Sequence, residues 1–103
     1  DGTSTEWEIA TSMAAYETTA DVIKFYNFCN EMAKKYGFGP MGSRRLGGSS
    51  DAAFITMAQT PVLCSCGVQG EWNHTAKEYA LVDSLFERTK LLSTIVLSLD
   101  QFK

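Results

Sequence analysis

Two long amphipathic segments, residues 18–36 and the stretch from about residue 83 onward, most constrain how this chain of 103 residues folds. In the first segment, apolar residues recur at three- and four-residue spacing, which is typical of a helix with one apolar face. Thr18 is a suitable N-cap, and Gly37 stands where a left-handed residue commonly ends a helix. In the last segment, Ser84 and Glu87 predict a capping box. The apolar face of that predicted helix consists of Leu85, Leu92, Ile95, Val96 and Leu99.

Shorter segments, separated by glycine and proline, lie between these helices. We expect short strands at residues 41–46 and 62–66, a looser strand near residues 7–13, and a short helix over residues 51–58 with Ser50 as its cap. Strands that alternate with helices favour a parallel sheet. The predicted fold is therefore α/β, a partial three-layer sandwich of mainly parallel strands with helices packed on them. A sheet of so few strands buries both of its faces only with difficulty, which suggests that the chain is incomplete or needs a partner.

Composition argues against several classes of function. A net charge of −3 gives no general attraction to nucleic acid or to an anionic membrane. No apolar run approaches the roughly 20 residues of a membrane span. Three cysteines, an odd number, argue against a disulfide framework, so we expect reduced thiols in a cytoplasmic protein. Core packing is the main interpretation of Cys29, Cys64 and Cys66, and metal or redox chemistry at the last two is the alternative.

Polar loops follow the two central predicted strands. Ligands bind beyond the carboxyl ends of strands in open parallel sheets, so residues 46–51 and 67–74 are expected to rim one crevice. The second loop carries the only histidine, His74. Glu78 follows four residues later, but the zinc-helix motif would need a second histidine. From the residues alone, His74 is either a surface or hydrogen-bonded histidine or one ligand of a metal site.

Several stretches, taken in order, resemble a known family. The run "GGSSDAAF" (residues 47–54) precedes "TPVLCSCG" (residues 60–67), then "GEWNHTAKEYALVDSL" (residues 70–85) and the last amphipathic segment. Over residues 18–103, this series resembles the C-terminal part of the catalytic domain in the two-zinc peptidases of the aminoacylase, carboxypeptidase G and peptidase T family.

The resemblance implies a role for each matching residue. His74 matches the last metal-ligating histidine of the family, and Glu78 matches a following glutamate whose role is open. In such enzymes two divalent ions, usually zinc, activate a water that attacks the amide bond of a small peptide or an N-acyl amino acid. The residues expected on the substrate side are Gly47, Gly48, Ser49, Asp51 and Asn73.

The sequence departs from the family in its metal ligands, because it has no second histidine and no Glu-Glu pair. We therefore interpret residues 18–103 as the C-terminal part of the catalytic domain, and residues 1–17 as the return from an absent lid domain. The intact parent is expected to be a zinc-dependent exopeptidase or aminoacylase. The chain alone is expected to be inactive and to lack tight zinc binding.

Two other classes of function stay open. One is a non-catalytic α/β module that binds a partner through a sheet edge or an apolar patch. An uncovered face could also pair two copies as a homodimer. The other is a thiol-dependent enzyme that uses Cys64 or Cys66, which would need His74 within hydrogen-bond reach of the sulfur.

Overall fold

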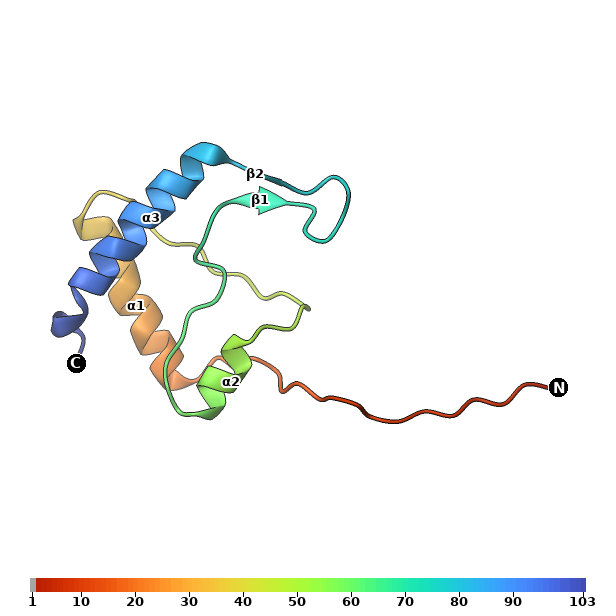
Figure 1. Cartoon of the computed structure of the whole chain (residues 1–103). Coiled ribbons are helices and arrows are strands. Elements are labelled where there is room, and N and C mark those ends of the chain that lie inside the picture. Colours follow the sequence, from red (N-terminus) through yellow and green to blue (C-terminus); the bar gives the residue numbers. More distant parts are fainter. Residues whose placement is uncertain (1) are drawn as a thin grey trace.

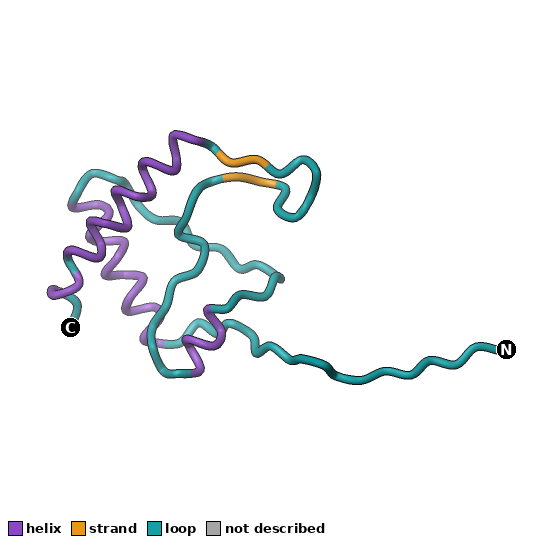
Figure 2. The backbone as a smooth tube through the Cα atoms, in the orientation of Figure 1, coloured by secondary structure: helices purple, strands orange, loops and turns teal. Residues whose placement is uncertain are grey.

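The computed structural model describes residues 2–103, and this part of the chain is mostly helix and loop (Figures 1 and 2). The elements are α1 (Ala20–Lys35), α2 (Ala52–Met57), β1 (Gly70–Glu71), β2 (Tyr79–Ala80), α3 (Val82–Leu97) and the 3-10 turn η1 (Leu99–Gln101). The radius of gyration is 18.0 Å, whereas a compact chain of this length has about 13 Å. Part of the difference comes from the N-terminal residues before Tyr16, which run away from the body as an arm (Figure 1).

Helices α1 and α3 pack against each other and form the core. Cys29, Met32 and Ala33 of α1 contact Leu91 and Ile95 of α3. Cys29 and Ala33 are small, and the distance between packed helices depends on the side chains at the contact, so the two backbones can approach closely. Partly buried side chains complete the cluster: Phe25, Phe28, Met41 and Leu63.

The first predicted helix is confirmed, with its cap one residue later than expected. The Thr19 hydroxyl oxygen, rather than that of Thr18, accepts a hydrogen bond from the backbone N–H of Val22 at 3.2 Å. The helix ends as predicted, because Gly37 is left-handed with a φ of +84°. The N–H of the following residue, Phe38, turns back to the carbonyl of Ala33 at 2.9 Å.

Helix α2 begins as the sequence predicts, whereas helix α3 does not. Helix α2 matches the predicted short helix, and the Ser50 hydroxyl oxygen accepts the N–H of Ala52 at 3.2 Å. Helix α3 begins earlier than expected, and the predicted capping box is wrong. The buried Ser84 hydroxyl instead donates to the carbonyl of Leu81 at 2.6 Å and accepts the N–H of Gln69 at 2.9 Å. Ser84 thus ties the hairpin to α3.

The predicted parallel α/β sandwich is wrong. Residues 2–103 hold one sheet of two short antiparallel strands, and the segments 7–13, 41–46 and 62–66 are not strands. Across the described chain, residues 39–49 and 61–68 make no backbone–backbone hydrogen bond. A strand exists only where a neighbouring strand pairs with its N–H and C=O groups, and these two segments have no such neighbour.

Side chains take over part of this missing backbone pairing. From α1, the Tyr26 hydroxyl donates to the carbonyl of Met41 at 2.6 Å, and the side-chain oxygen of Asn30 accepts the N–H of Met41 at 2.8 Å. The Tyr16 hydroxyl donates to the carbonyl of Val62 at 2.6 Å. Residues 39–49 are therefore fixed to α1 at Met41, and residues 61–68 to the N-terminal segment at Val62, rather than along a ladder.

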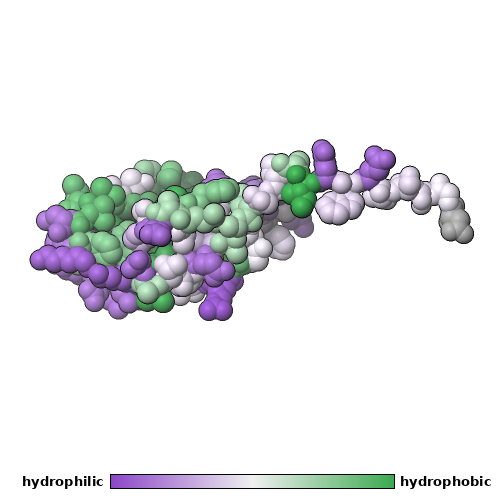
Figure 3. Space-filling view, turned by 90° about the horizontal axis from the view of Figure 1, so that it is seen from below, coloured by the Kyte–Doolittle hydropathy of each residue, from purple (hydrophilic) through white to green (hydrophobic). Residues whose placement is uncertain are grey.

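Helix α3 is apolar on two faces, and only one of them is covered. Of the predicted apolar face, Ile95 alone is buried, while Leu85, Leu92 and Val96 are exposed. We call the exposed side the outer face of α3; it consists of Val82, Leu85, Phe86, Leu92, Val96 and Leu97. Apolar side chains are spread over much of the visible surface of the helical body (Figure 3). None of the described helices combines the length and apolar composition that crossing a membrane requires.

Replacement of Leu91 by alanine tests which face of α3 holds the fold together. Leu91 is 4% exposed and Leu97 is 84% exposed. We expect L91A to lower the free energy of unfolding by about 2–5 kcal/mol because it leaves a cavity between the helices. The matched change L97A should lower it by less than about 1 kcal/mol. Urea unfolding followed by circular dichroism measures both, and equal losses would contradict the described packing.

Candidate functional site

His74 lies in the exposed loop of residues 72–78 that joins β1 to β2. Its backbone N–H donates to the Glu78 carboxylate at 3.3 Å. His74 and Glu78, which the sequence showed only to be four residues apart, therefore meet through the backbone of one and the side chain of the other. The imidazole makes no hydrogen bond with any residue that the structure describes, so both ring nitrogens are free to bind a ligand.

Local hydrogen bonds shape this loop. The backbone N–H and the hydroxyl of Thr75 both donate to the carbonyl of Trp72, at 3.1 and 2.7 Å, and the N–H of Glu78 donates to the carbonyl of Thr75 at 3.1 Å. Trp72 and His74 have φ values of +63° and +65°, a left-handed conformation that residues other than glycine rarely adopt. The loop therefore holds His74 in an uncommon backbone conformation at an exposed position. Asn73, between these two, is also exposed.

The predicted substrate loop around Gly47 and Gly48 is fully exposed. Neither glycine has a positive φ, and a side chain added at either would meet nothing within 4 Å. The fold therefore does not require glycine at these two positions. Ser49 and Asp51 are also exposed, and the Asp51 side chain makes no cap hydrogen bond to α2.

The expected crevice between the two loops loses its basis with the parallel sheet. Figure 1 draws both loops on the side away from the α1–α3 pair, but no hydrogen bond among the described residues joins them. The glycine-serine loop instead contacts a thiol, because the hydroxyl of Ser50 lies 3.0 Å from the sulfur of Cys64. The structure thus unites His74 with Glu78, and Ser50 with Cys64, but not the two loops with each other.

The residues present do not by themselves fit a zinc ion. Within residues 2–103 there is no group of three or more histidine, cysteine, aspartate or glutamate side chains placed to hold a metal. Protein zinc sites use three or four such ligands. This chain offers one free imidazole, so we derive no catalytic step through a metal from its residues alone.

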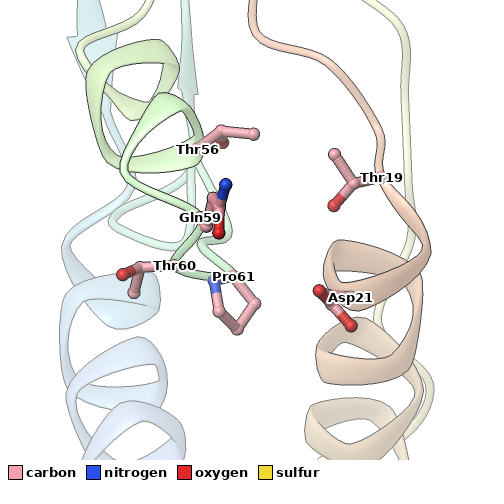
Figure 4. A pocket seen from close by; sticks show the side chains of 6 residues that line it. All are labelled: Thr19, Asp21, Thr56, Gln59, Thr60 and Pro61. Atoms are coloured by element: carbon pink, nitrogen blue, oxygen red, sulfur yellow. The ribbon is translucent and has the colours of Figure 1, made fainter.

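Two small clefts lie away from all the predicted site residues. The first has a volume of about 170 Å³ and is enclosed by the start of α1 and the end of α2. Its lining residues are Thr19, Asp21, Thr56, Gln59, Thr60 and Pro61, and Figure 4 shows the first two facing the other four. The second, of about 260 Å³, lies between α1 and the C-terminal residues 101–103. Both are smaller than the roughly 300–1,000 Å³ of ordinary ligand pockets.

The three thiols differ in their surroundings. Cys29 is buried, and burial, with the nearby Cys66 charge, raises its pKa to about 11. Cys64 is exposed and Cys66 is half-buried, so the core-packing prediction is correct for Cys29 and wrong for Cys64. Neither the Cys64 thiol nor the Cys66 thiol makes a hydrogen bond to His74. The sequence presented Ser50 only as a helix cap, and its contact with Cys64 could not be inferred from residue spacing.

Comparison of the chain with protein-family models, with curated proteins and with solved structures found no match. The function is therefore argued from the residues and their arrangement.

Replacement of Gly70 by alanine tests the hairpin that carries His74. A side chain at Gly70 would overlap the carbonyl oxygen of Tyr79 on the paired strand, so G70A should open the hairpin. We expect the amide of Leu81, which donates to the carbonyl of Gln69 at 2.8 Å, to lose protection in hydrogen exchange measured by NMR.

The matched control is G48A, where an added side chain meets nothing within 4 Å. G48A should leave the protection of Leu81 unchanged. Unchanged protection in G70A as well would show that this strand pair does not form.

Proposed function

We propose that this chain supplies one zinc ligand, His74, to a hydrolase that cleaves amide bonds of small peptides or N-acyl amino acids. The remaining ligands come from protein outside these 103 residues. The zinc ions, once bound between the two parts, supply the activation of water. His74 contributes a ring nitrogen, and the loop of residues 47–51, together with Asn73, contacts the substrate.

The observation that carries the proposal is the free imidazole of His74 on an exposed, locally ordered loop. The ring does not hold the fold together, because it makes no hydrogen bond to the described residues, and both of its nitrogens stay accessible at an exposed position. The backbone hydrogen bond to Glu78 holds the histidine backbone without occupying its ring. This arrangement suits a residue that binds something outside the chain.

The glycine-serine loop adds a second argument. Gly47 and Gly48 serve no steric or conformational need of the fold. Glycines without a structural role allow a ligand to approach the backbone closely. Their position before "SSDAAF", and the order of this motif and the His74 loop along the chain, are the features that resemble the two-zinc peptidases. The choice of enzyme class rests on this order and not on the sandwich fold, which the structure does not contain.

The outer face of α3 and the unpaired segments are consistent with a chain that docks on further protein. Residues 39–49 and 61–68 leave backbone donors and acceptors without backbone partners in the described chain. The six residues of the outer face carry no charge. Protein that completes the metal site could cover both. Three free thiols fit a reducing compartment, which we take to be the cytoplasm.

Replacement of His74 by alanine tests the proposed ligand. The open reading frame that encodes these residues should be expressed from its start codon to its stop codon, and its metal content measured by mass spectrometry. We expect about two zinc ions per polypeptide and hydrolysis of N-acetyl amino acids or dipeptides. H74A should lose about one zinc ion and lower kcat/KM by about 100-fold or more.

The control for this experiment is E87Q, which changes an exposed carboxylate on α3 and should alter neither quantity. A polypeptide without zinc would overturn the proposal. So would an H74A variant that keeps both its zinc content and its turnover.

Replacement of Gly47 and Gly48 by alanine tests the substrate loop separately. Because neither residue has a positive φ, the free energy of unfolding of the double variant should lie within about 1 kcal/mol of the original value. The variant should also keep its zinc. We expect KM for the substrate to rise, since the new methyl groups block approach to the backbone. Unchanged kinetics with unchanged zinc would remove these residues from the site while leaving the role of His74 intact.

A second candidate is a non-catalytic interaction module, favoured by the uncharged outer face of α3. The metal measurement separates the two candidates. A zinc-free polypeptide that self-associates in sedimentation, and that F86D on the outer face returns to monomer, would favour the module.

A further inference from the structure

A cluster of reactive and polar side chains surrounds Cys64, independently of His74. The sulfur of Cys64 is exposed and lies 3.0 Å from the Ser50 hydroxyl and 3.6 Å from the Ser65 hydroxyl. Cys66 is two residues away, half-buried, with its sulfur 3.8 Å from the carbonyl oxygen of Cys64. The sulfur of Cys64 is therefore accessible to small solutes, and the thiol of Cys66 is less accessible.

The Ser50 hydroxyl is placed to donate a hydrogen bond to the sulfur of Cys64. Its hydroxyl oxygen already accepts the N–H of Ala52 at 3.2 Å, which leaves the hydroxyl hydrogen free to point at Cys64. Hydrogen bonds donated to sulfur favour the thiolate. The Ser50 hydroxyl, followed by that of Ser65, accordingly lowers the pKa of Cys64 below the usual value for a thiol, against the opposing effect of partial burial.

Cys66 has the opposite character. Burial is the main reason that its pKa is raised, and a charge on Cys64 raises it further, while Arg88 acts in the other direction. When Cys64 ionises, Cys66 therefore stays protonated. Tyr16 and Cys29 also lie near the two thiols: the pKa of Tyr16 is raised by burial and by the charges of both, and that of Cys29 by burial and by the charge of Cys66. The pair thus consists of Cys64, an exposed nucleophile, and Cys66, a half-buried thiol that stays protonated.

The backbone between the two cysteines shortens their separation. Ser65 has a φ of +60°, in the left-handed region. Residues on either side of one with helical geometry, of either hand, have Cα atoms about 5.4 Å apart, against about 6.7 Å in an extended strand. Disulfides most often join Cα atoms about 5.5–6 Å apart. The left-handed φ of Ser65 and the contact of the Cys66 sulfur with the Cys64 carbonyl oxygen at 3.8 Å show that the chain turns back between the two cysteines, which brings them nearer to disulfide spacing than an extended strand would.

We propose that Cys64 and Cys66 form a modification site that hydroperoxides oxidise to an internal disulfide. The Cys64 thiolate attacks one oxygen of the peroxide, the O–O bond breaks, and the other oxygen leaves with a proton as water or an alcohol. The sulfur becomes a sulfenic acid. Cys66 then attacks the Cys64 sulfur, and the S–OH bond breaks. The hydroxide combines with the proton from Cys66 and leaves as water. In sum, two thiols and one peroxide give a disulfide, a water and an alcohol or second water.

Cys29 provides a control within the same chain. It is 1% exposed, and burial keeps it protonated. Oxidation through this site should consume two of the three thiols and spare Cys29. Trypsin separates the two groups, because Cys64 and Cys66 both fall in residues 46–77 and Cys29 falls in residues 25–34.

The experiment treats the reduced chain with one equivalent of hydrogen peroxide at pH 7. Thiol titration in denaturant should fall from three thiols to one, and the peptide of residues 46–77 should lose about 2 Da, the mass of the two hydrogens removed. C66S should stop at the sulfenic acid and be trapped by dimedone on Cys64. C64S should slow thiol loss by about tenfold or more, and C29S should leave the rate unchanged.

Ser50 is tested as a positioning residue by S50A, with circular dichroism to confirm the fold. The pH at which the oxidation rate reaches half of its maximum should rise in S50A, because the thiolate loses its hydrogen-bond donor. Oxidation of Cys29 as fast as Cys64, disulfides formed only between chains, or equal rates for C64S and the original would each overturn the proposal. An unchanged pH profile in S50A would overturn the role of Ser50.

Discussion

The packing of α1 against α3 is the interaction on which the rest of the structure depends. Cys29 and Ala33 on one helix meet Leu91 and Ile95 on the other, and burying such side chains contributes about 1.5–3 kcal/mol for each large one. The irregular segments are attached to this pair. Met41 and Leu63 add their side chains to its edge, and Ser84 at the start of α3 anchors the hairpin that carries His74. Loss of the helix contact would therefore release both loops of the candidate site.

The helices could be predicted from the sequence because their signals are local. The spacing of Val22, Cys29 and Met32, and the left-handed Gly37, depend only on neighbouring residues. The strands could not be predicted in the same way, because a strand needs a partner. Residues 41–46 and 62–66 have suitable composition, but their backbone groups find no partner strand in the described chain and are held by single side chains such as Tyr26 and Tyr16.

Local sequence patterns also do not reveal which face of α3 is covered or which side chains meet in the candidate site. Periodicity identified α3 as apolar and assigned Ile95 to one face with Leu85 and Val96. Ile95 instead packs on α1 beside Leu91, because a helix that is apolar on two sides does not reveal which side is covered. The sequence placed His74 and Glu78 four residues apart on one loop but did not predict that they meet. Their contact through the His74 backbone, and that of Ser50 with Cys64, depends on loop conformations with positive φ that no spacing rule supplies. In the proposed function, other protein covers the exposed apolar face of α3 and completes the site of the free imidazole.

The most direct test of that role is a crystal structure of the complete encoded polypeptide, with anomalous scattering data collected on both sides of the zinc absorption edge. The proposed function predicts an anomalous peak about 2.0–2.1 Å from a ring nitrogen of His74, with the remaining ligands outside these 103 residues. A zinc site that leaves the imidazole of His74 unbound, or a polypeptide that folds without any zinc, would contradict it.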